Sequence, residues 1–409
     1  MGFRAYDRGR DREAVHRIWK EVGWLEDGVE EAVDVLVDAS RAMVAEVHGG
    51  AECLVLTTPG TMRYLKQDIP FVGVTGVTTS RVARRRGLAK GLATLSLALG
   101  VADGAAVAGL GMFDQGFYNA LGFGTGSYEH HFRFDPAHLR AEVPQRMPRR
   151  ITKKDWADAH AARLCRFRRH GEINLCPAAA TRSEMLWQKK GFGLGYGDGP
   201  DGALSHYIWC DDRGGEHGPY AVRWFVYRTS QQFWELMGLL KSLGDQVHWI
   251  EMGEPPGIQL QDLLDQPFKE KRITRQSAHP VGNMAAAWWQ MRICDLSACL
   301  AHTYLDRGEV CFNLRLWDPI EAYLDHDAPW RGVGGEYVVS LGAHSRAERG
   351  RNAALPTVAA SVNAFTRLWL GVRPASSLAI TDDLQAPAAL LDRLDRVLCL
   401  PQPHVGWEL

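Results

Sequence analysis

The chain lacks long apolar runs and carries almost no net charge, and each absence excludes a class of protein. Among its 409 residues, 47 Lys and Arg nearly balance 48 Asp and Glu, which gives a formal net charge of −1. The overall charge therefore favours neither a nucleic acid nor a membrane surface as a partner. No apolar run approaches the roughly 20 residues needed to cross a bilayer, and residues 1–4 do not begin an apolar signal-peptide core. We expect a cytoplasmic protein without a nucleic-acid or membrane partner.

The cysteines lack the spacing of a metal cage or a disulfide framework. There are eight, none of them in Cys-x-x-Cys, and most lie in apolar contexts such as those of Cys210 and Cys399. We interpret them as reduced core thiols. The adjacent His130 and His131 lie on an expected strand, where successive side chains point to opposite faces, so they do not predict a joint metal site. The sequence predicts no metal cofactor.

Residues 74–92 lack the two commonest nucleotide-binding motifs. No Gly-Lys-Ser/Thr follows the glycine at position 87, and there is no Gly-x-Gly-x-x-Gly. The stretch contains instead a β-branched strand at 74–79, a turn with three consecutive arginines at 84–86, and a helix that opens at Gly87. Free backbone N–H groups and the helix dipole attract anions at such a helix start, and arginines suit phosphate oxygens. We therefore predict a phosphate-binding turn.

This turn, Arg84-Arg85-Arg86-Gly87-Leu88-Ala89, matches the pattern Arg/Gln-x-x-Gly-x-Gly/Ala. It resembles the pyrophosphate signature of the GCN5-related N-acetyltransferases (GNAT), which bind acetyl-coenzyme A (acetyl-CoA). The resemblance implies acetyl-CoA as the acyl donor. The residues implied in holding it are Val77, Thr78, Thr79, Arg84, Arg85, Arg86, Gly87, Leu88 and Ala89.

The order of expected elements indicates three segments. Residues 1–147 follow the acetyltransferase order and end with a strand at 127–134. Residues 148–286 restart with a similar strand, cap and helix but contain no Arg-x-x-Gly-x-Ala, as expected for a degenerate second copy that does not bind the cofactor. Residues 287–409 alternate strands and helices.

This three-part layout resembles the Eis (enhanced intracellular survival) family, whose members end in a sterol-carrier-protein-2-like (SCP2-like) domain. The resemblance implies an α+β fold, with tandem GNAT domains built on central mixed sheets and a C-terminal SCP2-like domain. It also implies a symmetric homo-oligomer, a hexamer.

Acetyl transfer to an amine needs a donor for the oxyanion and a proton for the departing thiolate. The family resemblance puts the oxyanion donor near Val77. Tyr118 lies in Gly116-Phe117-Tyr118-Asn119-Ala120-Leu121-Gly122-Phe123-Gly124, where family members carry an acid tyrosine. A phenol pKa of about 10 against a thiol pKa of about 8.5 keeps it protonated at neutral pH. An alternative is an aromatic side chain that only packs against the sheet.

Two further groups are implied on the amine side. The Eis resemblance implies that the C-terminal carboxylate, here that of Leu409, accepts a proton or orients a cationic amine, with Glu408 reinforcing a negative pocket. Trp24, Glu26 and Asp27 lie between the first two expected helices, in a loop that borders the acceptor cleft in this superfamily. Carboxylates beside an aromatic ring suit a polycationic amine, although a solvated turn would have the same composition.

Three functions fit these residues. The first is an N-acetyltransferase that modifies a polyamine, an aminoglycoside or a lysine side chain by direct transfer in a ternary complex. The second is a biosynthetic N-acyltransferase with a dedicated small acceptor or a longer acyl donor. The third is a non-catalytic carrier with vestigial GNAT domains, and the intact turn at 84–89 together with Tyr118 argues against it.

Overall fold

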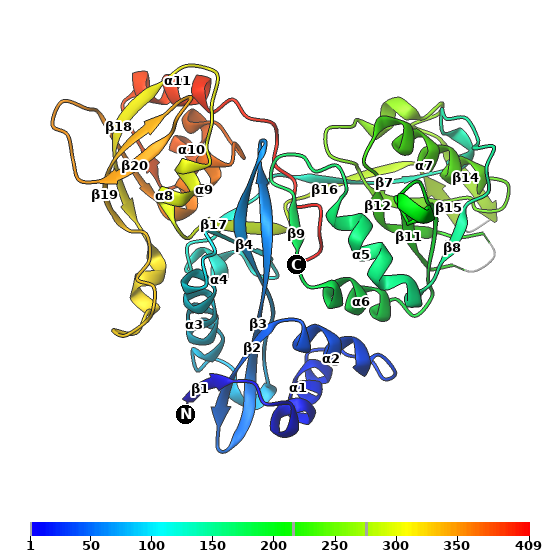
Figure 1. Cartoon of the computed structure of the whole chain (residues 1–409), viewed down its shortest axis with the longest axis horizontal. Coiled ribbons are helices and arrows are strands. Elements are labelled where there is room, and N and C mark those ends of the chain that lie inside the picture. The colour runs from blue at the N-terminus through cyan, green and yellow to red at the C-terminus, as the bar shows by residue number, and fades with distance from the viewer. Residues whose placement is uncertain (1, 215–216, 275–276) are drawn as a thin grey trace. The chain divides into compact units, whose positions relative to one another are not determined.

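The computed structural model describes residues 2–214, 217–274 and 277–409 (Figure 1). It contains two compact units that alternate along the chain. Unit 1 comprises Met1–Ser127, Arg169–Pro177 and Ala287–Leu409, and unit 2 comprises Tyr128–Arg168 and Ala178–Ala286. The mixed sheets with helices confirm the expected α+β class. No helix in the described part of the chain has the length and apolar character needed to span a membrane.

The main sheet of unit 1 has the strand order β1-β2-β3-β4-β5-β17-β6, and β9 pairs with β3. Its strands are β1 (Gly2–Ala5), β2 (Arg41–Val47), β3 (Gly50–Tyr64), β4 (Gln67–Thr79), β5 (Val107–Gly111), β6 (Gly124–Thr125), β9 (Ile173–Leu175) and β17 (Trp289–Ile293). Its helices are α1 (Arg8–Glu21), α2 (Glu30–Asp38), α3 (Leu88–Ala102) and α4 (Gln115–Asn119). The predicted elements of residues 1–111 therefore occur in the predicted order.

Helix α1 shows how local sequence sets these elements. The Asp7 carboxylate accepts a hydrogen bond from the Arg10 backbone N–H at 3.2 Å and so caps the helix. Val15, Ile18 and Trp19 recur at helical spacing and are buried. The capped end and the apolar stripe together fix this helix against the sheet.

Two strands of this sheet come from distant parts of the sequence. β17 pairs with β5 and β6, and the short β9 pairs with β3. The segment that the sequence placed at the end of the first domain, 127–134, instead contains β7 (Glu129–Phe134), which pairs with strands of unit 2. Its pairing partners lie far along the chain, at residues 250–253 and 282–286. The three domain ranges, 1–147, 148–286 and 287–409, remain a prediction.

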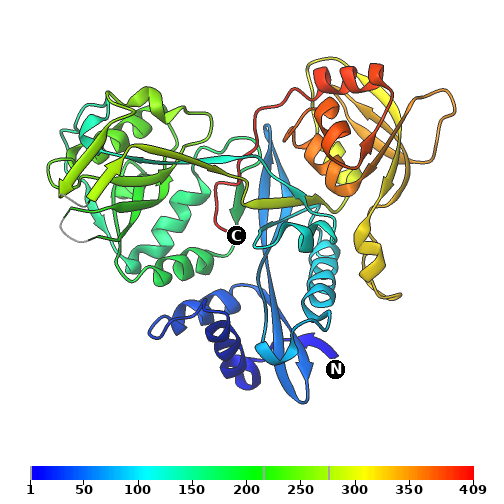
Figure 2. The same cartoon turned by 180° about the vertical axis from the view of Figure 1, so that it is seen from behind.

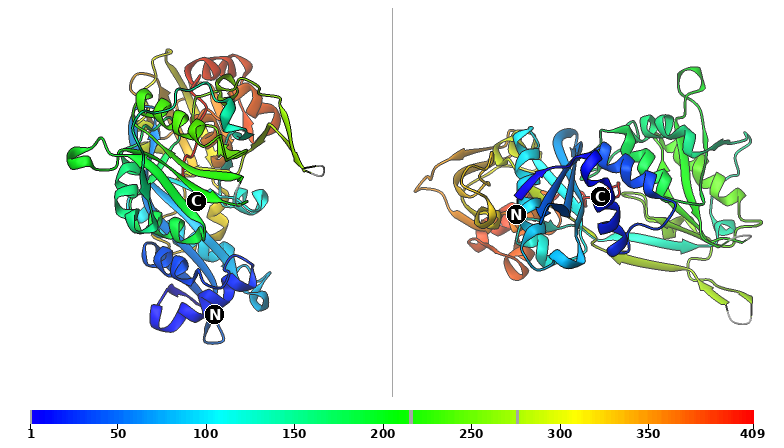
Figure 3. Two further views of the ribbon diagram at one scale, coloured as in Figure 1. Left: turned by 90° about the vertical axis from the view of Figure 1, so that its right-hand side faces the viewer. Right: turned by 90° about the horizontal axis from the view of Figure 1, so that it is seen from below.

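Unit 2 is built on a seven-stranded sheet of order β16-β7-β13-β12-β11-β10-β8. Besides β7, its elements are β8 (Arg149–Ile151), α5 (Trp156–Leu164), α6 (Ala178–Trp187), β10 (Gly191–Tyr196), β11 (His206–Asp212), β12 (Tyr220–Val226), α7 (Ser230–Ser242), β13 (Ile250–Gly253) and β16 (Gly282–Ala286). The hairpin β14 (Glu270–Thr274) and β15 (Ser277–Pro280) extends away from the rest of this unit (Figure 3).

The C-terminal part of unit 1 contains a separate five-stranded sheet of order β20-β19-β18-β21-β22. Helices α9 to α11 gather on one face of it (Figure 2). The elements are α8 (Leu296–Ala301), β18 (Val310–Trp317), the 3-10 helix η6 (Pro319–Tyr323), β19 (Gly335–Leu341), β20 (Arg346–Arg349), β21 (Thr357–Ser361), α9 (Val362–Trp369), α10 (Ala375–Thr381), β22 (Leu384–Gln385) and α11 (Ala388–Val397). The strands predicted at 310–317 and 336–341 match β18 and β19 within one residue.

A buried ion pair joins this C-terminal part to the main sheet of unit 1. Arg292 on β17 and Asp318 before η6 are both fully buried, with a nitrogen–oxygen distance of 2.6 Å. The Arg292 guanidinium also donates to the Leu121 carbonyl, and it lies 4.8 Å from the Trp330 ring centre. The Asp318 carboxylate accepts a further bond from the Val333 N–H at 3.0 Å. Both charges are therefore compensated inside the core.

His170 makes a second buried link within unit 1. Its Nδ1 accepts from the Leu65 N–H at 3.1 Å and its Nε2 donates to the Leu370 carbonyl at 3.0 Å. The ring also packs edge-on against Tyr64. These partners fit a neutral imidazole, and burial, aided by the nearby His404, lowers the pKa of His170 to about 4.

The depressed pKa predicts an acid-sensitive contribution to stability. Between pH 6.5 and about 4 the unfolded chain binds a proton at His170 that the folded chain does not. The free energy of unfolding therefore falls as the pH drops through this window, by up to about 3 kcal/mol. Urea denaturation at several pH values should show a shallower loss for His170→Gln than for the wild type. Equal pH dependence in both proteins would contradict the assignment.

Candidate active site

The site forms where two neighbouring parallel strands separate. β4 and β5 pair only as far as Val74 and Leu110. Just beyond this point the pairing of β4 with β3 is irregular. Leu56 pairs with Thr75 and Leu54 pairs with Thr78, so Gly76 and Val77 lie opposite a single residue of β3. Two residues thus face one, as in a β-bulge, which bends a strand and redirects its backbone.

Glycine is required at this bulge. Gly76 has a φ of +63°, and a Cβ there would lie 3.0 Å from the Leu56 side chain and 3.2 Å from the Trp19 ring. A side chain would be strained by the backbone and crowded by both neighbours. The bulge carries Val77 to the mouth of the gap between β4 and β5.

A cavity of about 440 Å³ occupies this gap. It brings together several residues predicted from different parts of the sequence, namely Trp24, Val77, Tyr118, Glu408 and Leu409. Its lining is Trp24, Val74, Thr75, Gly76, Val77, Gly111, Met112, Phe113, Tyr118, Trp288, Glu408 and Leu409.

Tyr118 is held on the short helix α4. The Asp114 carboxylate caps that helix by accepting from the Phe117 N–H at 2.9 Å. The phenol ring packs edge-on against Phe113 and Phe117, with centroid distances of 5.4 Å and 4.9 Å. Burial, with a smaller effect of the Asp114 charge, raises the pKa of Tyr118 well above its usual range. The hydroxyl is therefore protonated at neutral pH and can donate a proton.

The basic turn precedes α3 as predicted. Gly87 occupies the N-cap with a φ of +76°, a left-handed conformation that glycine adopts without strain. Because this cap residue has no side chain, it offers no side-chain oxygen to the N–H groups of the first turn. Arg84, Arg85 and Arg86 are all exposed beside it. The turn thus has the features of an anion site, and its role in holding acetyl-CoA remains a proposal.

The remaining predicted cofactor residues lie on or beside these elements. Leu88 is buried and Ala89 half-buried on the first turn of α3. The hydroxyl of Thr78 donates to the Gly76 carbonyl at 3.2 Å, and that of Thr79 donates to the Cys53 sulfur at 3.3 Å. Both hydroxyls thus hold the end of β4 in place.

The C-terminal tail is fixed along unit 1. The Ser127 hydroxyl donates to the Pro403 carbonyl, and the His404 N–H donates to the His170 carbonyl at 3.1 Å. The Ile173 N–H then donates to the Val405 carbonyl at 3.0 Å. Val405 and Trp407 are buried. These contacts direct the tail toward the gap between β4 and β5.

Leu409 lies against two strand glycines. A Cβ on Gly111 would lie 2.7 Å from a carboxylate oxygen of Leu409, and one on Gly73 would lie 2.9 Å from a methyl group of the Leu409 side chain. A larger residue at position 111 would displace the backbone of Leu409, whereas one at position 73 would turn the Leu409 side chain aside. The sequence analysis missed both glycines, although glycine inside a strand indicates close approach of another group.

The predicted acceptor residues divide into two groups. Trp24, which packs edge-on against Trp19, and Glu408 line the cavity. Glu26 and Asp27 are exposed outside this lining, and Asp27 pairs with Lys20 at 2.6 Å. Trp288, which precedes β17, lines the cavity. It could not be predicted because β17 joins this sheet from far along the chain.

Comparisons with known proteins agree with this architecture. Residues 8–126 match the sequence model of the acetyltransferase (GNAT) domain. No curated protein matches the chain. A probable N-acyltransferase of unknown function from Enterococcus faecalis is similar over 100% of this chain and 99% of its own, at 16% identity and a TM-score of 0.78.

Two other solved structures are similar over the whole length of both chains. They are a GCN5-related N-acetyltransferase from Anabaena variabilis, at 14% identity and a TM-score of 0.78, and Eis1 from Mycobacterium abscessus, at 17% identity and a TM-score of 0.75. At these identities the likeness concerns the fold. Residues 8–126 thus form an acetyltransferase domain of the GNAT type, within a chain that shares its complete fold with these proteins.

Proposed function

We propose that the protein is an acetyl-CoA-dependent N-acetyltransferase whose reaction takes place in the cavity between β4 and β5. The observation that carries the proposal is that Tyr118, the bulged strand at Val77 and the tail residues Glu408 and Leu409 line the same cavity. The start of α3, where Gly87 provides no side-chain cap beside three exposed arginines, supports the fit of a phosphate-bearing thioester. Acetyl-CoA would supply the activated acetyl group.

Each group then has one task in the transfer. The amine nitrogen forms a bond to the thioester carbonyl carbon, and a backbone N–H near Val77 donates to the oxygen that becomes negative. The carbon–sulfur bond breaks with its electron pair on sulfur, and Tyr118 donates the proton that the thiolate takes up. The amine loses its extra proton to a carboxylate or to water beside it. The carboxylates of Glu408 and Leu409 are our candidates, and they would also attract a cationic acceptor.

Direct transfer, without an acyl-enzyme, is supported by the state of Cys53, whose sulfur contacts Thr79 at the end of β4. Cys53 is buried, and burial raises the pKa of its thiol to about 11. The thiolate, which is the nucleophilic form, is therefore scarce at neutral pH.

We propose a polyamine, an aminoglycoside or a lysine side chain as the acceptor. The cavity lining contains the Trp24 ring together with the carboxylates of Glu408 and Leu409, and such a combination suits a cationic amine.

Thiol release from acetyl-CoA, measured with a panel of these amines, tests the proposal. Turnover that depends on the amine, with a mass increase of one acetyl group on the product, would support it. Binding of CoA without turnover would indicate a dedicated acceptor outside the panel. A protein that does not bind CoA at all would contradict the proposal and favour a carrier.

The tail offers a separate prediction. Gly111→Val should displace Leu409, because a Cβ at Gly111 already lies 2.7 Å from the Leu409 oxygen. We expect kcat/KM for the amine to fall by about 10- to 100-fold, as for the loss of a positioning contact, while affinity for CoA changes little. The control is Gly2→Val, since an added Cβ at that position would have no neighbour within 4 Å. Unchanged amine kinetics in Gly111→Val would remove Leu409 from the mechanism.

The likeness to Eis1 also motivates two finer proposals. We propose that the C-terminal part is SCP2-like and that the chain forms a symmetric hexamer, as the resemblance in the sequence implies. Light scattering on the purified protein measures its mass directly. A monomer at assay concentrations would reject the hexamer without affecting the proposed chemistry.

A further inference from the structure

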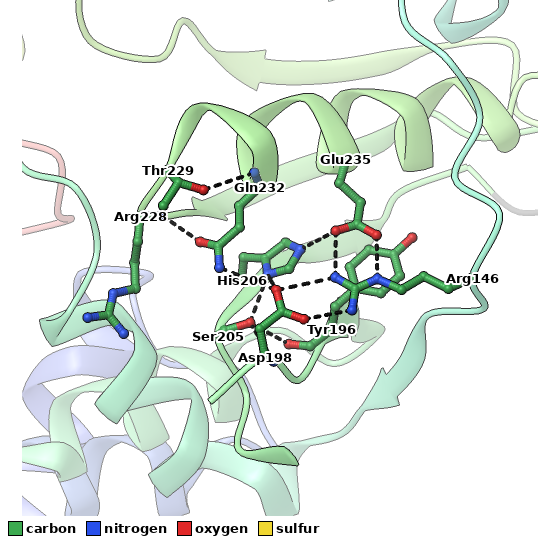
Figure 4. Close-up of polar contacts among 9 residues, drawn as sticks. All are labelled: Arg146, Tyr196, Asp198, Ser205, His206, Arg228, Thr229, Gln232 and Glu235. Atoms are coloured by element: carbon green, nitrogen blue, oxygen red, sulfur yellow. Dashed lines mark hydrogen bonds and ion pairs between the residues drawn. The ribbon is translucent and has the colours of Figure 1, made fainter. Parts of the chain in front are cut away.

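Unit 2 contains a polar cluster that the proposed function does not use. Asp198 lies in the loop after β10, His206 begins β11, and Glu235 lies on α7 (Figure 4). One ligating atom from each of these three side chains lies within 4.8 Å of the other two. Their spacing of 8 and 29 residues along the chain matches no metal-binding motif, so the sequence did not reveal them.

The hydrogen bonds around His206 are compatible with a metal-binding imidazole. The Ser205 hydroxyl donates to the Tyr196 carbonyl at 3.1 Å, and the same oxygen lies 2.8 Å from His206 Nδ1. In the tautomer in which this hydroxyl accepts from Nδ1–H, His206 Nε2 presents its lone pair on the side of a Glu235 oxygen 2.9 Å away. In the other tautomer, Nε2–H donates to that oxygen. The first tautomer is the one that a metal ion between His206 and Glu235 would select.

Arg146 partly neutralises the two carboxylates of the cluster. Its guanidinium bridges the two carboxylates, with nitrogens 2.6 Å from an Asp198 oxygen and 2.6 Å from a Glu235 oxygen. With a neutral His206, the cluster of two carboxylates and one guanidinium keeps a net charge of −1. Without Arg146 the charge is −2, which a divalent cation would neutralise. One Arg146 nitrogen, Nη2, contacts both carboxylates and so lies where such a cation would bind.

A buried hydroxyl beside the cluster points to the same conclusion. Tyr196 is 3% exposed, and its hydroxyl has no hydrogen-bond partner among the described residues. Its ring packs against the Arg146 guanidinium at 4.5 Å, and its hydroxyl is turned to the Glu235 side of the cluster (Figure 4). Buried hydroxyls are seldom left unpaired, so this one is available to a ligand held by Glu235.

The cluster also has access to solvent. Asp198, Glu235 and Arg146 line an open cavity of about 830 Å³ together with Trp234 and residues 140–145. Arg146 is 45% exposed and comes from this cavity wall, so its side chain can move into the cavity without disturbing a core. The cavity would also leave room for water on a bound ion.

We propose that Asp198, His206 and Glu235 bind a divalent transition-metal ion, and that Arg146 swings into the cavity when the ion enters. One imidazole and two carboxylates suit zinc, cobalt and manganese. Metal–ligand distances of about 2.0–2.2 Å place ligand atoms roughly 3.4 Å apart in a tetrahedral site, which side-chain rotations can reach from the present spacing. The Ser205 hydroxyl would fix the His206 tautomer, as second-shell groups do in metal sites.

Calorimetric titration of the chelator-treated full-length protein with ZnCl₂ tests this site. We expect one zinc ion per chain, with binding lost in His206→Gln and weakened by about 10- to 100-fold in Glu235→Gln. Arg146→Gln removes the competing ion pair and should tighten binding by about tenfold. Arg140→Gln, a change of the other arginine that lines the cavity, is the matched control and should bind as the wild type does.

A second variant tests one other pair of histidines in unit 2. His217 and His248 stack with a centroid distance of 4.8 Å, so zinc bound there should be lost in His248→Gln and kept in His206→Gln. That result, or no zinc uptake by the wild type, would overturn the proposal. Circular dichroism of each variant checks its folding. The absorption spectrum of Co²⁺ in the wild type and in Glu235→Gln reports the ligands even if His206→Gln does not fold.

Discussion

Replacing Tyr118 by phenylalanine is expected to lower kcat for acetyl transfer by about 10²- to 10⁴-fold, the usual contribution of a positioned general acid. The ring would keep its packing against Phe113 and Phe117, because only the hydroxyl is removed. The departing thiolate would then have to take its proton from water. Affinity for CoA, measured by calorimetry, should change little, because the proposed phosphate contacts lie at residues 84–89.

Tyr304→Phe is the matched control, since Tyr304 is an exposed tyrosine of the same unit. It should retain wild-type kinetics. Because burial raises the pKa of Tyr118, the phenol stays protonated above pH 10, and kcat of the wild type should show no loss from its ionisation below that pH. Full activity in Tyr118→Phe would show that Tyr118 is not the general acid and that its ring only packs against the neighbouring side chains.

Replacing Asp318 by asparagine is expected to cost about 3–5 kcal/mol of folding free energy, the usual effect of removing one partner from a buried ion pair. Arg292 would keep its charge in a position with no exposed surface. Asparagine has nearly the same volume, so the loss would report charge rather than packing. Urea denaturation of the purified protein measures the change.

Two comparisons isolate the electrostatic cause. Glu348→Gln removes one partner of the ion pair with Arg346, whose side chains are 69% and 71% exposed, and should change stability by less than about 1 kcal/mol. The double replacement Arg292→Met with Asp318→Leu should recover most of the loss, because no uncompensated charge remains. A cost below about 1 kcal/mol in Asp318→Asn would show that water reaches the pair.

The same ion pair supports the segment after Tyr118. A Cβ on Gly122 would lie 2.6 Å from an Arg292 nitrogen and 3.0 Å from an Asp318 oxygen. The Asn363 side chain donates to the carbonyls of Asn119 and Phe123 at 2.8 Å and 2.9 Å. Asp318→Asn should therefore also reduce activity, through the position of α4.

Local sequence was sufficient for the parts of the site that depend on neighbours in the chain. The turn at 84–89 and the helix that follows it need only a strand, a glycine and an amphipathic run, and all three are visible in the sequence. Tyr118 was identified from its place in a short motif. The resemblance also indicated that the chain's end approaches the first domain, and Glu408 and Leu409 line its cavity.

Nonlocal pairing was not predictable from one sequence. β9 has three residues, too few for an alternating pattern, and nothing at residues 289–293 indicates that β17 pairs with a strand near residue 110. The pairing partners of β7 lie equally far along the chain, at residues 250–253 and 282–286. The cluster of Asp198, His206 and Glu235 was invisible as well, because a loop, a strand and a helix bring its members together.

The alternation of the two units along the chain has a consequence during synthesis. β17 completes the sheet beside β5, yet about 180 residues separate the two strands in the sequence. At roughly 5–20 residues per second, the ribosome needs on the order of ten seconds or more between them, while β5 waits with an unpaired edge. Such an edge invites association with other chains. Nascent chains that have passed β5 but not β17 are therefore the species most in need of a chaperone, and a stop codon in this interval should yield an aggregating product rather than a shorter enzyme.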